Sequence, residues 1–148
     1  MPFGAPPAPP PQVNDPHGVG LAVGRLGSGG RRSGRVAFAV LAALLGEGDV
    51  VDVVVQGRFR GGPGVAALVG ARVFVVNDRP WKPDVVVMPV GPDLQVQGWQ
   101  DERTASLRFI TPSGHELVDR IGDRVLAIEL AQRVRDRTAQ AQSGDQPG

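Results

Sequence analysis

The fold is decided by the stretch Gly62-Pro-Gly-Val-Ala-Ala-Leu-Val-Gly-Ala-Arg-Val-Phe-Val-Val-Asn-Asp-Arg79. Residues 65–69 and 72–76 within it are largely apolar runs rich in β-branched side chains, which favour strands. Gly70-Ala71 separates the two runs and Asn77-Asp78 ends the second, and glycine, asparagine and aspartate are typical turn residues. The stretch therefore predicts a hairpin of two largely buried strands.

Strand patterns continue on both sides of this hairpin. They cover residues 50–59, 84–90, 94–100, 104–110 and 115–121. Glycine- and proline-containing turns separate them. Apolar and polar side chains alternate along 104–110, so Leu107 and Phe109 are expected on one face of that strand and Arg108 on the other. Seven short strands at nearly even spacing predict an antiparallel barrel or sandwich rather than a parallel sheet.

Helices are predicted on either side of the strands. Residues 35–46 are apolar on every face after the first residue, and their ten apolar residues rise about 15 Å as a helix, half of a bilayer core. We favour a helix buried against the following sheet, although Arg31-Arg32 before it also resembles the charged start of a secretion signal. Residues 122–138 place Leu126, Leu130 and Val134 on one face, so this amphipathic helix is expected to close one side of the sheet.

Both ends of the chain are expected to be disordered. Residues 1–34 consist largely of Pro, Gly, Ala and Ser, and residues 139–148 are similarly small and polar. Such segments bury too little apolar surface to offset the entropy lost on ordering. His17, within the first segment, is expected to be a solvated loop histidine. Residues 35–138 remain as a single domain, which is the number that 148 residues support.

Composition and charge exclude several functional classes. Cysteine is absent, which excludes disulfides and thiolate ligands. Four arginines against Asp15 give the first 35 residues a charge of +3, and the formal net charge of +1 leaves −2 for the rest, so nucleic acid is not an expected partner. The sequence contains no metal-ligand cluster and no glycine-rich cofactor motif. Ser106, Ser113 and His115 lack the arrangement of a catalytic triad, and the chain is not expected to be an enzyme.

The order of seven strands followed by one amphipathic helix is similar to that of the pleckstrin-homology superfold, and most closely resembles short bacterial pleckstrin-homology-like domains. Leu44-Leu-Gly-Glu-Gly-Asp-Val50 resembles the start of such domains, and residues 64–76 resemble the hairpin of their second and third strands. The resemblance covers residues 36–138. It implies a mainly β fold with α helices: a seven-stranded antiparallel bent barrel, preceded by a short apolar helix, open at one end and capped at the other by the C-terminal helix. It implies no catalysis.

Two groups of residues are candidate binding sites. Phosphoinositide-binding members of the resembled superfold hold basic residues on their first two strands, and Arg58 and Arg60 lie at the end of the first strand here. Alternate residues of a strand share a face, so both guanidinium groups are placed where they could bind one phosphate or carboxylate. The second strand adds no matching basic residue, which favours the alternative that the two arginines only keep an exposed strand end soluble. The other group lies in the loop after the third strand and contains Arg79, Trp81 and Lys82. Its tryptophan is expected either to contact a partner, as an anchor in a protein or in a membrane interface, or to cover the barrel mouth.

These features lead to two functional hypotheses. The first is a cytoplasmic, non-enzymatic interaction domain whose exposed strand edge or barrel loops bind a protein partner or a second copy of the chain. The resemblance adds that some relatives assemble through such edges. The alternative is peripheral association with anionic membranes through the basic residues of the two candidate sites and of the N-terminal arm. Neither hypothesis requires a metal, a cofactor or nucleic acid.

Overall fold

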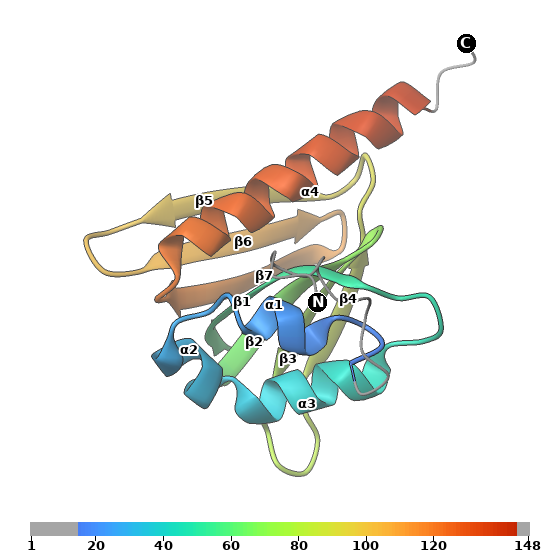
Figure 1. The fold of residues 1–148 in the computed structure, drawn as a ribbon. Coiled ribbons are helices and arrows are strands. Elements are labelled where there is room, and N and C mark those ends of the chain that lie inside the picture. Colours follow the sequence, from blue (N-terminus) through green and yellow to red (C-terminus); the bar gives the residue numbers. More distant parts are fainter. Residues whose placement is uncertain (1–14, 145–148) are drawn as a thin grey trace, which may run out of the picture.

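The computed structural model describes residues 15–144, and the side chains of residues 15–142. The elements in this range follow one another as α1 (Val19–Val23), α2 (Ser28–Ser33), α3 (Arg35–Leu44), β1 (Val51–Phe59), β2 (Gly62–Val69), β3 (Arg72–Asn77), β4 (Val85–Pro89), β5 (Gln95–Gln100), β6 (Ala105–Thr111), β7 (Gly114–Ile121) and α4 (Arg124–Gly144) (Figure 1). All seven predicted strands are present, with bounds within a few residues of those expected.

The strands form one antiparallel sheet in the order β4-β3-β2-β1-β7-β6-β5 (Figure 1). The predicted hairpin is β2 and β3, whose register runs from Gly64↔Asn77 to Val69↔Arg72. Among the described residues β4 and β5, at the two ends of this order, do not pair with each other, so the sheet is not closed. With α4 packed on it, the chain has the predicted mainly β fold with α helices: an open seven-stranded antiparallel sheet capped by a C-terminal helix, which is consistent with the expected pleckstrin-homology-like bent barrel.

The two halves of the sheet, β4-β3-β2-β1 and β7-β6-β5, meet where β1 lies against β7. β1 pairs with β2 over most of its length, but its register with β7 consists of the pair Arg58↔Asp119. Beside this pair, a Cβ atom on Gly57 would lie 2.3 Å from the backbone oxygen of Asp119, closer than a side chain can approach. The close contact between the halves therefore requires glycine at position 57.

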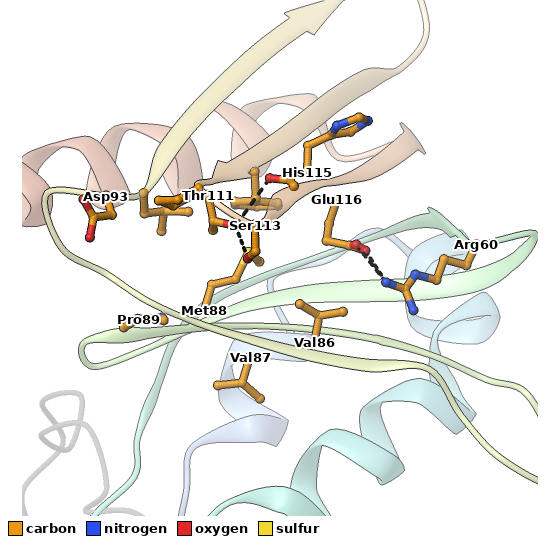
Figure 2. Close-up of a pocket in the computed structure, with 14 residues that line it drawn as sticks. Arg60, Val86, Val87, Met88, Pro89, Asp93, Thr111, Ser113, His115 and Glu116 are labelled. Atoms are coloured by element: carbon orange, nitrogen blue, oxygen red, sulfur yellow. Dashed lines mark hydrogen bonds and ion pairs between the residues drawn. The ribbon is translucent and has the colours of Figure 1, made fainter.

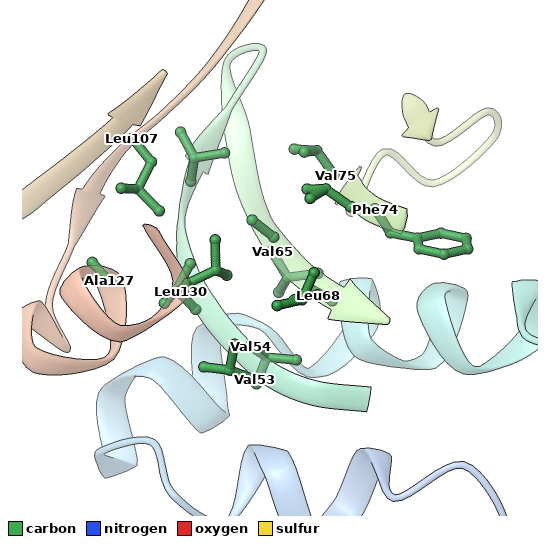
Figure 3. Close-up of a cluster of buried hydrophobic side chains, with 14 of the residues drawn as sticks. Val53, Val54, Val65, Leu68, Phe74, Val75, Leu107, Ala127 and Leu130 are labelled. Carbon is green, nitrogen blue, oxygen red and sulfur yellow. The ribbon is translucent and has the colours of Figure 1, made fainter. Parts of the chain in front are cut away.

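β1, β2 and β3 form the centre of the core because both of their faces are covered. Residues 65–69 of β2 are each at most 2% exposed. α1 and α2 pack on β1, and α3 packs on β2 and β3, while α4 packs on β5 and β1. Figure 3 shows side chains of these strands, among them Val54, Leu68 and Val75, in one cluster with Leu130 of α4. In β6 burial alternates instead, with Leu107 and Phe109 inside as predicted.

α3 packs on the sheet as predicted, but only one of its faces is buried. Ala37, Phe38 and Leu41 face inward, whereas Val36 is 53% exposed and Leu44 is 41% exposed. The helix ends at Leu44, two residues earlier than predicted. Within residues 15–144 no helix is long and apolar enough to cross a membrane.

Residues 15–34, predicted to be part of a disordered arm, are folded. They form α1 and α2 and bury Ala22 and Leu26 against the domain. The Asp15 carboxylate accepts hydrogen bonds from the first turn of α1, from the N–H groups of Gly20 at 3.0 Å and Leu21 at 3.2 Å. The remainder of the predicted arm, residues 1–14, lies outside the described residues.

Two contacts hold this N-terminal segment to the other end of the domain. The Arg25 guanidinium donates to both carboxylate oxygens of Glu129 in α4, at 2.7 and 2.9 Å, and this holds the pKa of Glu129 below its ordinary value. The N–H of Gly27 donates to the Asp123 carboxylate at 2.9 Å. The prediction of disorder was wrong because local composition does not register partners 96 and 104 positions away.

Two smaller predictions are also wrong. His17 is half-buried rather than solvated, and its Nδ1 lies 2.8 Å from the carbonyl oxygen of Asp49. α4 continues to Gly144, so residues 139–144 are helical rather than a disordered tail, and residues 145–148 lie outside the described range. Alanine and glutamine, which dominate that last stretch, are good helix formers once a preceding helix has been nucleated. The buried face of α4 contains Leu126, Leu130 and Val134, as predicted.

Candidate functional site

The outer edge of β4, which we call the β4 edge, carries backbone groups that face away from the sheet. The N–H of Asn77 donates to the carbonyl of Asp84 at 3.1 Å, and the N–H of Val90 donates to the carbonyl of Ala71 at 2.8 Å. Because hydrogen-bonded residues alternate along an antiparallel pair, the even-numbered residues from 84 to 90 bond to β3. Val85, Val87 and Pro89 point their backbone groups outward, and no strand within residues 15–144 pairs with them.

β4 lacks most of the features that protect an edge strand from pairing. Charged side chains and bulges commonly block such edges, but β4 reads Val-Val-Val-Met-Pro and its register with β3 has no shift. Pro89 removes one outward donor at the end of the strand. Val85 and Val87 remain 38% and 44% exposed, so the β4 edge presents both free backbone groups and apolar side chains.

A groove of about 640 Å³ runs along the β4 edge, between β4 and the hairpin of β6 and β7 (Figure 2). Val86 and Met88 point into this edge groove, whereas Val87 points to the opposite face of the sheet, toward the helices (Figure 2). The apolar part of the lining also includes Leu94 and Phe109, and the polar part comprises Arg60, Asp93, Thr111, Ser113, His115 and Glu116.

The positive charge on the rim of the edge groove is already paired. The Arg60 guanidinium binds the carboxylate of Glu116 through both oxygens and lies 3.5 Å from Oδ1 of Asp84. The hydrogen bond to Glu116 raises the pKa of Arg60. Arg60 follows the last residue of β1 in a left-handed conformation, with φ of 51°, which directs its side chain out of the strand pattern. The edge groove therefore favours uncharged side chains over an anion.

Asn77 fixes the position at which β4 begins. It is 0% exposed and is the one buried polar residue of the described chain. Its Nδ2 donates to the Asp84 carboxylate at 2.8 Å, and its Oδ1 accepts the Asp84 N–H at 2.7 Å. The guanidinium of Arg79 adds an ion pair to the same carboxylate at 3.3 Å and donates to the carbonyl of Arg60 at 2.8 Å. This network joins the loop before β4 to the turn after β1.

Substitution of Asn77 with alanine is expected to reduce the free energy of unfolding by about 1–3 kcal/mol, because the Asp84 N–H would lose its buried acceptor. Urea denaturation followed by circular dichroism measures this loss. Asp93→Ala, at an exposed position on the same groove, serves as the control and should change stability by less than about 0.5 kcal/mol. Equal effects of the two substitutions would contradict the role assigned to Asn77.

The structure does not gather the five predicted site residues into one place. Arg60 and Arg79 meet around Asp84, but Arg58 donates to the carbonyl of Gly61 at 2.9 Å and lines a separate hollow of about 480 Å³ that Arg60 also borders. Trp81 is 97% exposed, so it does not cover the barrel mouth, and Lys82 is exposed beside it. Binding of phosphate or of anionic membranes by these residues stays a prediction.

Sequence reasoning missed the residues that form the edge groove. The sequence places Val86 and Met88 in a strand but not at an edge, and Leu94 and Phe109 in strands with no binding role. The signal that could have found the edge is the charge-free run that ends in Pro89, since proline in a strand is confined to edges, strand ends and bulges. The order of strands, which places β4 beside the β6–β7 hairpin, is not encoded in any one segment.

Comparisons with known proteins add no further assignment. Within residues 15–144 no group of three or more His, Asp or Glu side chains is arranged to hold a metal ion. No model of a known protein family matches the chain, and no curated protein or solved structure is significantly similar to it.

Proposed function

We propose that this chain is a non-enzymatic, pleckstrin-homology-like interaction domain that binds an extended protein segment along its β4 edge. The segment belongs either to a different protein or to a second copy of the chain. The observation that carries the proposal is the outward direction of the backbone groups of Val85, Val87 and Pro89 beside the edge groove. A partner strand supplies the hydrogen bonds that such an edge lacks.

The edge groove would give this pairing its selectivity. Alternate side chains of an added strand point to opposite faces, so every second one would enter the groove beside Val86 and Met88. The remaining side chains would lie over Val85 and Val87, on the face of the sheet that the helices cover. Since the Arg60 guanidinium is paired with Glu116 and Asp84, small or branched apolar side chains suit the groove best.

The polar groups of the edge groove support a binding role rather than a catalytic one. The Ser113 hydroxyl lies 3.1 Å from the Thr111 hydroxyl, and both belong to the turn between β6 and β7. A serine nucleophile needs a base within hydrogen-bond distance, and within residues 15–142 the Ser113 hydroxyl has no such contact with His115.

Replacing Val87 with proline tests the proposal, because proline removes the outward N–H and leaves the bonds of Val86 and Met88 to β3 intact. Pro89 already occupies a position of the same kind, so the strand tolerates the substitution. Tagged wild-type protein, Val87→Pro and Val87→Thr are compared as baits in cells that express the protein. Threonine is the matched control because it keeps both β-branching and the N–H.

The expected result is a defined set of proteins retained by the wild type and by Val87→Thr but reduced about tenfold or more by Val87→Pro, since a bound carbonyl would lose its donor. Unchanged thermal unfolding of the three baits would show that the fold is intact. Identical binding by all three baits would contradict strand addition at β4.

A further inference from the structure

We infer that residues 1–14 pack lengthwise on the solvent-facing side of α3 and cover its exposed apolar side chains. This inference goes beyond the proposed function and does not depend on the β4 edge. It begins with the composition of α3: after Arg35, all nine remaining residues of this ten-residue helix are apolar, whichever side they face. A helix that is apolar on every side is ordinarily enclosed. α3 therefore lacks a cover on one side.

The uncovered side of α3, which we call the α3 face, consists of residues one helical turn apart. Its members follow the i, i+3, i+4, i+7 spacing that places side chains on one side of a helix, with one more residue beside them: Val36, Ala39, Val40, Ala43 and Leu44. Val40 is half-buried and the other four are exposed. α3 lies at the outside of the molecule, and the elements within residues 15–144 leave this side of it open to solvent (Figure 1).

The α3 face is too small for a separate partner. It has five residues, and the exposed charged residues Arg35 and Glu47 bound it at its two ends. A stable interface between independent proteins takes about 20–30 residues from each side. A segment of the same chain needs far less contact, because its covalent tether keeps it at an effective concentration in the millimolar range. The size of the α3 face therefore favours an occupant from the same chain.

The described chain begins beside the C-terminal end of α3. Nδ1 of His17 lies 2.8 Å from the carbonyl oxygen of Asp49, and the Val51 N–H donates to the His17 carbonyl at 2.8 Å. The Asp49 carboxylate accepts the N–H of Gly46, two residues after the end of α3, at 2.8 Å. The preceding segment therefore joins the domain next to this end of α3. As a polyproline II helix its fourteen residues would reach about 43 Å, against about 15 Å for the length of α3.

The composition of residues 1–14 suits an uncharged helical surface. The segment is the longest stretch of the sequence without a charged side chain, and six of its fourteen residues are proline. Because the backbone of α3 is bonded within the helix, the α3 face offers apolar side chains and no backbone partners. Polyproline II segments keep their own backbone groups in water, and proline lowers the entropy lost on ordering. Such a segment can bury its prolines on α3 without losing hydrogen bonds.

A spin label on the segment tests the inference in the full chain, which contains no cysteine of its own. A nitroxide is attached to Ala8→Cys, and NMR measures the relaxation that it induces in methyl groups. In a docked polyproline II segment, position 8 lies about 22 Å from Asp15 and close to Val36, which is about 12 Å along α3 from its C-terminal end. Leu21 is the internal control, because its N–H donates to the Asp15 carboxylate and its side chain is 79% exposed. We expect faster relaxation at Val36 than at Leu21. A segment held only at Asp15 would relax Leu21 at least as fast as Val36, and that result would overturn the inference.

A charge placed in the middle of the α3 face provides the second arm. Ala39→Glu is expected to lower the nitroxide-induced relaxation rate at Val36 about tenfold, because a docked segment would take the new carboxylate out of water. Ala139→Glu is the matched control, since it makes the same substitution at an exposed alanine of α4 and should leave the rate unchanged. Circular dichroism checks that both variants keep their helices. Equal rates at Val36 in the two variants would contradict docking on α3.

Two further measurements identify other occupants of the α3 face. Isotope-labelled protein without nitroxide is mixed with nitroxide-labelled protein without isotope, and relaxation at Val36 in this mixture would assign the face to a second copy. If the attached nitroxide leaves Val36 unaffected, while phosphatidylglycerol vesicles bind the wild type but not Ala39→Glu, the occupant is a membrane. Either result overturns the inference. Neither affects the proposed function, which is tested by Val87→Pro at a site outside α3.

Discussion

Replacement of Gly57 with alanine is expected to reduce the free energy of unfolding by at least about 3 kcal/mol, at or beyond the upper end of ordinary overpacking. The new methyl carbon would lie 2.3 Å from the backbone oxygen of Asp119, 2.9 Å from Cγ1 of Ile121 and 3.1 Å from Cγ1 of Val118. Side chains can rotate away from such a contact, but the Asp119 carbonyl belongs to β7, whose register with β1 is the pair Arg58↔Asp119. Relief of the clash must therefore separate the halves of the sheet.

Urea denaturation monitored by circular dichroism and tryptophan fluorescence measures this effect. Gly29→Ala in α2 is the matched control, because no atom lies within 4 Å of its added Cβ. It should leave stability unchanged or raise it by up to about 1 kcal/mol through helix propensity. A Gly57→Ala variant as stable as the wild type would show that the two halves of the sheet are not held by this contact.

Replacement of Leu130 with alanine is expected to reduce the free energy of unfolding by about 2–5 kcal/mol, the range for a large apolar side chain removed from a packed core. Leu130 is 0% exposed, in the helix that packs on β5 and β1 (Figure 3). Its loss leaves a cavity between helix and sheet that neighbouring Ala127 and Ala131 are too small to fill.

Val125 provides the control on the same helix, because it is 76% exposed. Val125→Ala should change stability by less than about 0.5 kcal/mol. Thermal unfolding by calorimetry compares the two variants with the wild type. Similar unfolding temperatures for Leu130→Ala and the wild type would mean that α4 does not cap the barrel in solution.

The strands could be predicted because each carries its own signals. Glycine and proline mark the turns, and in β6 the alternation that places Leu107 and Phe109 inside is visible in seven consecutive residues. β2 begins earlier than predicted, at Gly62, because its glycines pair with the end of β1, where Gly57↔Gly64 brings two residues without side chains together. That pairing depends on two separate segments of the chain, whereas a local sequence pattern describes only one segment at a time.

The same limit of local sequence patterns explains why α1, α2 and the edge groove could not be predicted: each depends on contacts between segments that lie far apart in the sequence. Ala22 and Leu26 are too few apolar residues to fold a segment alone, and they become buried only against β1 and the surrounding core. The edge groove combines residues from β4, from the turn before β5 and from the β6–β7 hairpin, and the Arg60 side chain at its rim leaves the strand pattern at a positive φ. The order of the strands in the sheet and the left-handed backbone conformation of Arg60 determine which residues form the edge groove.

The hydrogen bonds from Arg25 to α4 and from Gly27 to Asp123, the residue before α4, also bear on how the protein is made. Their acceptors, Glu129 and Asp123, are synthesised 104 and 96 residues later. At ribosomal speeds of about 5–20 residues per second, Arg25 and Gly27 would wait about 5–20 s in the nascent chain before these two acceptors exist, whereas β1, on which α1 and α2 pack, is translated earlier. The N-terminal segment therefore completes its native contacts only after residues 123–129 have been translated, and a chain truncated before them would hold α1 and α2 without these two hydrogen-bonding partners.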